Sequence, residues 1–228
     1  FWSVSLVAEM YTINTFFIIL IIYLLITTHY LLLAIFLFGL AMGNRIDIVL
    51  IAPGVLYWLI RNKEIKIYSL TRLTVYALLF FLGVSVYLFL PIRSKTQPHL
   101  NWNKPDNIQT LVDTITRKTH GKTLDLISSR YTISDVFASE MKVYLKRTYK
   151  LFTYAGIPFM LFGFLYLYGK KRHFLVSTFL IYFISGPVFI AIAKMPPNPH
   201  ALAIMEPHYL ISDLILVLWF GCGIYYIS

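Results

Sequence analysis

The sequence predicts an all-α protein, a polytopic bundle of transmembrane helices with an outward loop that carries amphipathic helices. Of its 228 residues 58% are hydrophobic and 13% are charged, where soluble domains average about 25% charged residues. Several apolar runs reach the length of roughly 17–25 residues that a helix needs to cross a hydrocarbon core. No segment alternates polar and apolar residues as the strands of a membrane barrel do, so the spans are expected to be helices.

Apolar segments follow one another along the chain, and about seven of them are expected to cross the membrane wholly or in part. They cover residues 1–27, 30–42, 46–60, 73–90, 151–168 and 174–193, and a seventh begins near residue 209. We expect three parts, namely the first helices (1–92), an outward loop (93–148) and further helices (149–228). The chain opens without Met and closes inside an apolar run, which is typical of the interior of a longer protein.

The apolar stretch from residue 30 to residue 60 is too long for one span. As a single helix it would extend about 46 Å, well beyond a hydrocarbon core of about 30 Å. A break at Gly43 and Asn44 resolves this, because both residue types favour a chain reversal. We therefore expect two short helices that meet at the sequence GNRID (43–47), at a face of the membrane.

Counting crossings places several connections on the same side of the membrane. With Glu9, these are the turn 43–47 and the loops 91–148 and 194–208. The opposite side receives the short connections 61–72 and 169–173, which together carry seven Lys and Arg residues. The first side has more, with ten Lys and Arg residues in its long loop besides Arg45 and Lys194. Short loops count more than long ones under the positive-inside rule, which favours an outward-facing turn 43–47, although charge alone leaves the orientation open.

The outward loop contains two stretches with helical periodicity. Asp106 is expected to cap a helix, with Gln109 three residues later, and its apolar face would contain Ile108, Leu111, Val112 and Ile115. A second candidate covers residues 133–147, where one face would contain Ile133, Phe137, Met141 and Tyr144. Both patterns predict amphipathic helices lying at the membrane interface.

Charge and composition exclude several classes of function. The net charge of +10 indicates anionic lipid headgroups or a lipid phosphate as partners in a membrane protein, and no nucleic acid. Cys222 is the single cysteine and excludes an internal disulfide. The Gly-Lys-Thr at 121–123 lacks the earlier glycine of a phosphate-binding loop. His200, Glu206 and His208 match no metal-ligand spacing, so we expect a solvated or interfacial loop and no metal site.

Charged side chains stand in the apolar surroundings of the first and third segments, at Glu9, Arg45 and Asp47. A charge at the centre of a bilayer costs about 2.5–3.5 kcal/mol, so each is expected to face protein, a wet cavity or the membrane surface. Two interpretations stay open. These residues form a functional site, or Glu9 lies at an ordinary interface while Arg45 and Asp47 form a local ion pair that closes the turn.

The segment 90–107 combines features of a membrane boundary and of a binding site. An apolar helix is expected to end at Pro91, which places Arg93 at headgroup level, where a guanidinium can hold a phosphate. Asn101 and Trp102 follow in a turn flanked by prolines. They fit a contact with a sugar, and they fit equally well a Trp that only anchors the turn.

Four stretches in this order resemble a known family. They are FWSVSLVAEMYTIN (1–14), GLAMGNRIDIVLIAPG (39–54), YLFLPIRSKTQPHLNWNKPDN (87–107) and ITRKTHG (115–121). Together they are similar to the transmembrane protein 260-like protein O-mannosyltransferases, a branch of the GT-C superfamily of membrane glycosyltransferases. The resemblance covers residues 1–121; beyond them only the hydropathy pattern is similar.

The resemblance implies an integral, multi-pass enzyme of a bacterial inner membrane or the endoplasmic reticulum. It would move a mannose-like sugar from a polyprenyl or dolichyl phosphate carrier to a hydroxyl of a protein or glycan, with no tightly bound cofactor. The family motifs match Ala8, Glu9, Tyr11 and Asn14, then Leu90 to Arg93, then Asn101 and Trp102. Asn44, Asp47, Arg117 and His120 lie in the matching stretches and complete the candidate site residues.

The mechanism that the resemblance implies needs an acid or base and a phosphate site. Enzymes of this class use an acidic residue in the first outward loop, which is expected to precede Phe1, with Glu9 in a supporting role. Arg45 and Arg93 are the candidates that stabilise the growing charge of the leaving lipid phosphate. A transporter or lipid flippase with a broken helix pair is the alternative, and a non-catalytic scaffold whose basic loop binds anionic lipid is a third.

Overall fold

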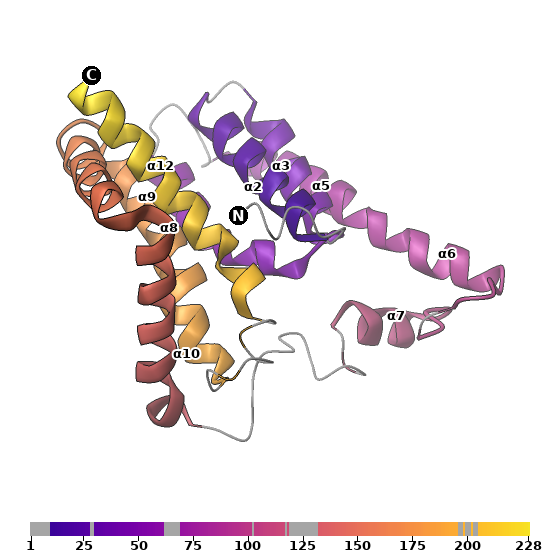
Figure 1. Cartoon of the computed structure of the whole chain (residues 1–228). Helices are drawn as coiled ribbons and strands as arrows, with labels where there is room; N and C mark the ends of the chain where they lie inside the picture. Colours follow the sequence, from indigo (N-terminus) through magenta and orange to yellow (C-terminus); the bar gives the residue numbers. More distant parts are fainter. Residues whose placement is uncertain are drawn as a thin grey trace.

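The computed structural model describes residues 10–27, 30–61, 69–101, 103–116, 118, 132–195, 198, 202 and 205–228. All regular structure in these residues is helical (Figure 1). The elements are α2 (Met10–Ile26), α3 (Leu31–Met42), η1 (Ile46–Ile51), α4 (Ala52–Arg61), α5 (Leu70–Val84), η2 (Ser85–Leu88), α6 (Phe89–Lys95), α7 (Ile108–Ile115), α8 (Ile133–Lys170), α9 (Arg172–Phe183), η4 (Ile184–Val188), α10 (Phe189–Ala193), η5 (Glu206–Tyr209) and α12 (Leu210–Ile227). The predicted all-α class is confirmed.

Four helical stretches among the described residues are long and apolar enough to cross a membrane. They are Leu70–Lys95, Val136–Lys170, Arg172–Ala193 and Glu206–Ile227. Two shorter apolar helices, Tyr11–Ile26 and Leu31–Met42, add to them. This pattern is that of a multi-pass integral membrane protein, as the hydropathy of the sequence predicts.

The helices pack in two groups that meet at α2, α4 and α12. Helix α3 packs against α5 and α2, whereas α8 and α9 pack against α12. Helix α4 lies on α9, and α12 also contacts α2, so the two groups share one apolar core (Figure 1). Ile18, Ile51 and Ile215 are fully buried where the groups meet.

Glycines allow two of these helix pairs to approach very closely. A Cβ atom added at Gly83 of α5 would collide with the carbonyl oxygen of Phe36 on α3, and one at Gly39 of α3 would collide with that of Phe80. Gly163 of α8 and Gly223 of α12 stand in the same relation to the opposite backbone. Small residues at crossing points are the usual device for packing helices in lipid, where apolar side chains gain little from leaving the solvent.

The predicted break between the second and third segments is confirmed. Helix α3 ends at Met42, and η1 begins at Ile46 after an extended residue, Arg45, with φ −151° and ψ 131°. Gly43 keeps a right-handed conformation with φ −66°, so its role differs from the expected reversal. A Cβ atom at Gly43 would collide with the side chain of Val86, which shows that the glycine admits η2 beside the turn.

The expectation that the fourth span ends at Pro91 is wrong. Helix α6 continues to Lys95 without a break after α5 and η2. Pro91 is the third residue of α6 and follows the 3₁₀ turn η2. Arg93 therefore lies on a helix and not in a loop.

The first amphipathic helix of the loop is confirmed, with its start shifted by one residue. Asn107 caps α7, not Asp106, because its side-chain oxygen accepts a hydrogen bond of 2.9 Å from the N–H of Thr110. In return, the hydroxyl oxygen of Thr110 accepts a hydrogen bond of 3.2 Å from the N–H of Asn107. The apolar face of α7 is open, since Ile108 is 82% exposed and Val112 is 47% exposed.

The second amphipathic stretch differs from the expected interfacial helix. Residues 133–147 lie in the first part of α8, which is interrupted by a kink at Thr153, with φ 57° and ψ 178°, before it continues to Lys170. Tyr144 is completely buried, and Phe137 and Met141 pack against the same cluster beneath α10. Most of the apolar face of this stretch is therefore covered by protein, although Ile133 is 49% exposed. The expected boundary between residues 148 and 149 lies close to the kink at Thr153.

Candidate functional site

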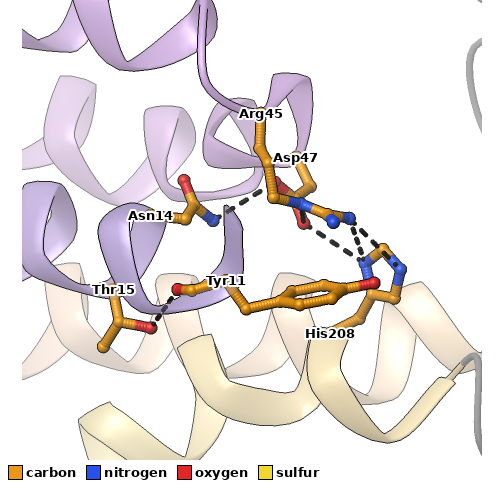
Figure 2. Close-up of polar contacts among 6 residues, drawn as sticks. All are labelled: Tyr11, Asn14, Thr15, Arg45, Asp47 and His208. Atoms are coloured by element: carbon orange, nitrogen blue, oxygen red, sulfur yellow. Dashed lines mark hydrogen bonds and ion pairs between the residues drawn. The ribbon is translucent and has the colours of Figure 1, made fainter. Parts of the chain in front are cut away.

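Polar side chains from three separate parts of the chain meet beside the turn that joins α3 to η1. Tyr11 and Asn14 come from the first turns of α2, Arg45 and Asp47 from the turn itself, and His208 from η5 (Figure 2). We call these five residues the Arg45 cluster. It brings together four of the residues that the sequence marks as candidates.

Arg45 and Asp47 form a buried ion pair at the centre of the cluster. The Nε atom of Arg45 donates to a carboxylate oxygen of Asp47 over 2.9 Å, and the two side chains are 9% and 7% exposed. The guanidinium also lies 4.0 Å from the centre of the Tyr11 ring. Its Nη2 atom points to the imidazole of His208, 3.3 Å from Nε2 (Figure 2). The local ion pair is thus real, but it is also part of a larger arrangement.

Three groups share the carboxylate of Asp47. Asn14 donates to Oδ1 over 3.2 Å, while Arg45 and the Nδ1 atom of His208, 3.2 Å away, both face Oδ2. Burial alone would raise the pKa of Asp47, but the hydrogen bond with His208 and the positive charge of Arg45 outweigh it and hold the pKa below its ordinary value. Asp47 is therefore ionised at neutral pH and holds Arg45 in place.

His208 is the member of the cluster that the sequence analysis missed. The expectation of a solvated or interfacial position is wrong, because His208 is 8% exposed. Its ring stacks on Phe189 with centroids 5.1 Å apart and meets the edge of Tyr11 at 5.7 Å. The only local signal was a histidine directly before an apolar helix. Its partners lie far away in the sequence, so no spacing rule could reveal them.

A second ionic cluster lies on the other side of η5 and was also missed. Arg147 of α8 binds Asp213 of α12 with 2.7 Å between Nη1 and a carboxylate oxygen, and Glu206 of η5 with 3.1 Å between Nε and Oε1. Asp213 and Arg147 are 8% and 14% exposed, whereas Glu206 is 55% exposed. This cluster pairs its charges internally and joins α8 to the start of α12.

Other predicted site residues lie apart from the Arg45 cluster. Arg93 is exposed on α6, which runs away from the turn at 43–47 (Figure 1). Asn101 donates to the backbone oxygen of Ser94 over 3.2 Å and to its hydroxyl oxygen over 3.1 Å, so it ties the loop back to α6. Asn44 is half-buried in the turn. Four further candidates, Glu9, Trp102, Arg117 and His120, lie outside the described residues.

An apolar cleft of about 510 Å³ opens between α2, α3, α4 and α5. Its walls include Ile21 of α2, Phe38 of α3, Val55 of α4 and Phe80 of α5. Ile21 lies two helical turns beyond Asn14 on α2, so the cleft begins about 10 Å along the helix from the Arg45 cluster. Among the described residues, the charged Arg45 cluster therefore lies close to a cleft whose apolar walls suit a hydrocarbon chain.

Within the described residues, no group of three or more His, Cys, Asp or Glu side chains is placed to hold a metal ion. Arg45 is the group in the cluster best suited to bind an anion, since the π face of Tyr11 and the carboxylate of Asp47 orient its planar fork of donors. No protein-family model, no curated protein and no solved structure matches the chain.

Proposed function

We propose that this protein is a membrane glycosyltransferase that moves a mannose-like sugar from a polyprenyl phosphate carrier to a hydroxyl acceptor at the outer or luminal face. The observation that carries the proposal is the Arg45 cluster, a buried and oriented guanidinium beside the helix break at 43–47. The motif resemblance of residues 1–121 supplies the reaction class. Membrane lipids, the lipid-linked donor and a protein or glycan acceptor are the partners in this proposal.

Arg45 would stabilise the leaving phosphate of the carrier. Charge grows on that phosphate as the bond to the sugar breaks, and a fixed cation in a site of low dielectric constant lowers the barrier most at that moment. Asp47 and Asn14 would hold the guanidinium in place, and His208, whose ring nitrogens face Arg45 and Asp47, would support it from the other side. The apolar cleft would take the first isoprene units of the carrier.

The acid or base that activates the acceptor hydroxyl would come from outside the described residues. We propose an outward loop before Phe1 for it, with Glu9 in support, as the resemblance implies. Arg93 remains a proposed second cation for the phosphate, and its exposed position on α6 gives it access to headgroups but no contact with the Arg45 cluster.

The test is sugar transfer by the intact purified protein in lipid nanodiscs, with radiolabelled polyprenyl phosphate mannose as donor. Arg45→Ala should lower kcat by about a hundredfold or more, the typical loss when one group that stabilises transition-state charge is removed. Arg45→Lys should recover only part of the rate, because an ammonium lacks the planar fork. Arg93→Ala tests the second proposed phosphate ligand in the same assay.

Arg172→Ala is the matched control. Arg172 is exposed at the start of α9, over the ring of Tyr168 and far from the turn at 43–47. This variant should leave transfer unchanged. If a well-folded Arg45→Ala variant transfers sugar as fast as the wild type, Arg45 has no role in the reaction. No transfer by the wild type, with any lipid-linked sugar donor, would count against the enzyme itself.

A transporter or lipid flippase is the second candidate, and a specific observation favours it. The helix pair broken at 43–47 and the open apolar cleft beside it form the kind of discontinuous helix arrangement that transporters use to bind substrates. Movement of a labelled lipid between the leaflets of vesicles, without sugar transfer, would establish this candidate in place of the first.

A further inference from the structure

The turn η5 takes part in both ionic clusters at once. His208 faces Arg45 and Asp47, whereas Glu206 and Tyr209, at the two ends of the turn, face Arg147 of α8. In a 3₁₀ turn, residues three apart share one side. Residues 206 and 209 therefore point the same way, and residue 208 is free to point to the other side.

One guanidinium binds this turn along its whole length. Arg147 pairs with Glu206 at the first residue of η5, lies 5.6 Å from the ring of Tyr209 at its last residue, and pairs with Asp213 in the following turn of α12. The planar fork of an arginine can hold several acceptors in a fixed geometry, and a lysine cannot. At the end of the turn the N–H of Leu210 donates to the oxygen of Pro207, where η5 passes into α12.

We infer that Arg147 is a positioning residue that holds η5 so that the His208 imidazole lies against Arg45 and Asp47. Without the guanidinium, Asp213 would keep a buried charge that lacks its cation, and the start of the turn would lose its tie to α8. The ring of His208 also contacts Phe189 and Tyr11, and its nitrogens face Arg45 and Asp47.

The role of Arg147 in catalysis rests on the proposed function, but its role in geometry does not. The test therefore reads the exposure of His208 directly and needs no turnover. The intact protein in nanodiscs is treated with diethyl pyrocarbonate, which modifies accessible imidazoles, and the rate at each histidine is followed by peptide mass spectrometry. His208 should react slowly in the wild type, because its side chain is 10% exposed.

In Arg147→Met the rate at His208 should rise about tenfold, which corresponds to about 1.4 kcal/mol of lost local stability. In Arg147→Lys the rate at His208 should lie between those of the wild type and Arg147→Met, since an ammonium replaces the planar guanidinium. Glu206→Gln should raise the rate at His208 less, because it breaks only the pair of Arg147 with the exposed Glu206 and leaves the buried pair with Asp213. His173, exposed and hydrogen-bonded to Tyr57, should keep its rate in all variants and serve as the internal reference.

Lys146→Met is the matched control, because it removes the same charge from an exposed neighbour on the same helix. An unchanged rate at His208 in Arg147→Met, or an equal rise in Lys146→Met, would overturn the inference. So would faster amide hydrogen exchange throughout α3 and α5 in Arg147→Met, since that would reveal general loosening. Absence of sugar transfer in the wild type, together with a raised rate at His208 in Arg147→Met, would count against the proposed function and leave the role of Arg147 in place.

Discussion

The Nη2 atom of Arg45 lies 3.3 Å from the Nε2 atom of His208, although the two residues are 163 positions apart in the sequence. This contact closes the Arg45 cluster, because His208 also reaches the carboxylate that holds Arg45. The cluster therefore depends on the docking of η5 against the turn at 43–47. Its parts should stabilise one another, so removing one member should be felt by all of them.

Asp47→Asn should destabilise the fold by about 3 kcal/mol at neutral pH, because it leaves Arg45 as a buried charge without its anion. The free energy of unfolding, measured by chemical denaturation in mixed micelles, gives this value. Asp106→Asn, a change of an exposed aspartate, should have little effect. An equal loss of unfolding free energy in both variants would show that the ion pair of Arg45 and Asp47 does not account for the effect.

The same variant should also change how stability depends on pH. The folded-state pKa of Asp47 lies below its ordinary value of 3.8, so its contribution is present above pH 3.8 and is lost as the pH falls toward the folded pKa. The wild type should therefore lose stability below pH 3.8 more steeply than Asp47→Asn. Parallel curves for the two proteins, from unfolding measured at a series of acidic pH values, would contradict the assigned shift.

Gly83→Val should destabilise the protein by about 3 kcal/mol, since the new side chain would have to displace the backbone of α3 at Phe36 and Gly39. The thermal midpoint in detergent measures the effect. Gly221→Ala is the control, because nothing lies within 4 Å of a Cβ atom there; it should be neutral or stabilising by up to about 1 kcal/mol. Equal midpoints for the two variants would exclude the close crossing of α3 and α5.

Helix α7 should lie in the membrane interface with its open apolar face toward the lipid chains. Spin labels at Val112→Cys and Gln109→Cys, in a Cys222→Ser background, report on the two faces of the helix. The label at 112 should be relaxed by oxygen, which concentrates in lipid, and the label at 109 by a water-soluble nickel complex. Equal access of the nickel complex to both positions would place α7 in water.

The turn at 43–47 should face the outer side of the membrane. A cysteine at Asn44→Cys, again with Cys222→Ser, should react with an impermeant maleimide added outside intact cells, and one at Lys171→Cys should react only after the cells are opened. Labelling of position 44 from the cytoplasmic side alone would show that the topology is the reverse of the one proposed. It would also contradict the proposed access of a carrier from the outer or luminal face.

Hydropathy alone predicted most of the helices. The break at residues 43–45, the amphipathic α7 and the apolar segments that became α2, α3, α5, α9 and α12 all follow from local pattern and residue type. These features depend on neighbours within a few positions, so a single sequence contains the information that decides them. The errors lie where a longer-range contact intervenes. The pattern of residues 133–147 predicts an interfacial helix, because an apolar face that meets lipid is indistinguishable in sequence from one that packs on protein.

Residue type and a separation of two positions are enough to predict that Arg45 and Asp47 are costly in an apolar region and that they can pair. That Asn14, Tyr11 and His208 complete the cluster, and that Arg93 lies apart on α6, follows from the fold. The helix crossings decide which ends of distant segments meet, and a charge or an imidazole carries no signal of its partner until the chain has folded.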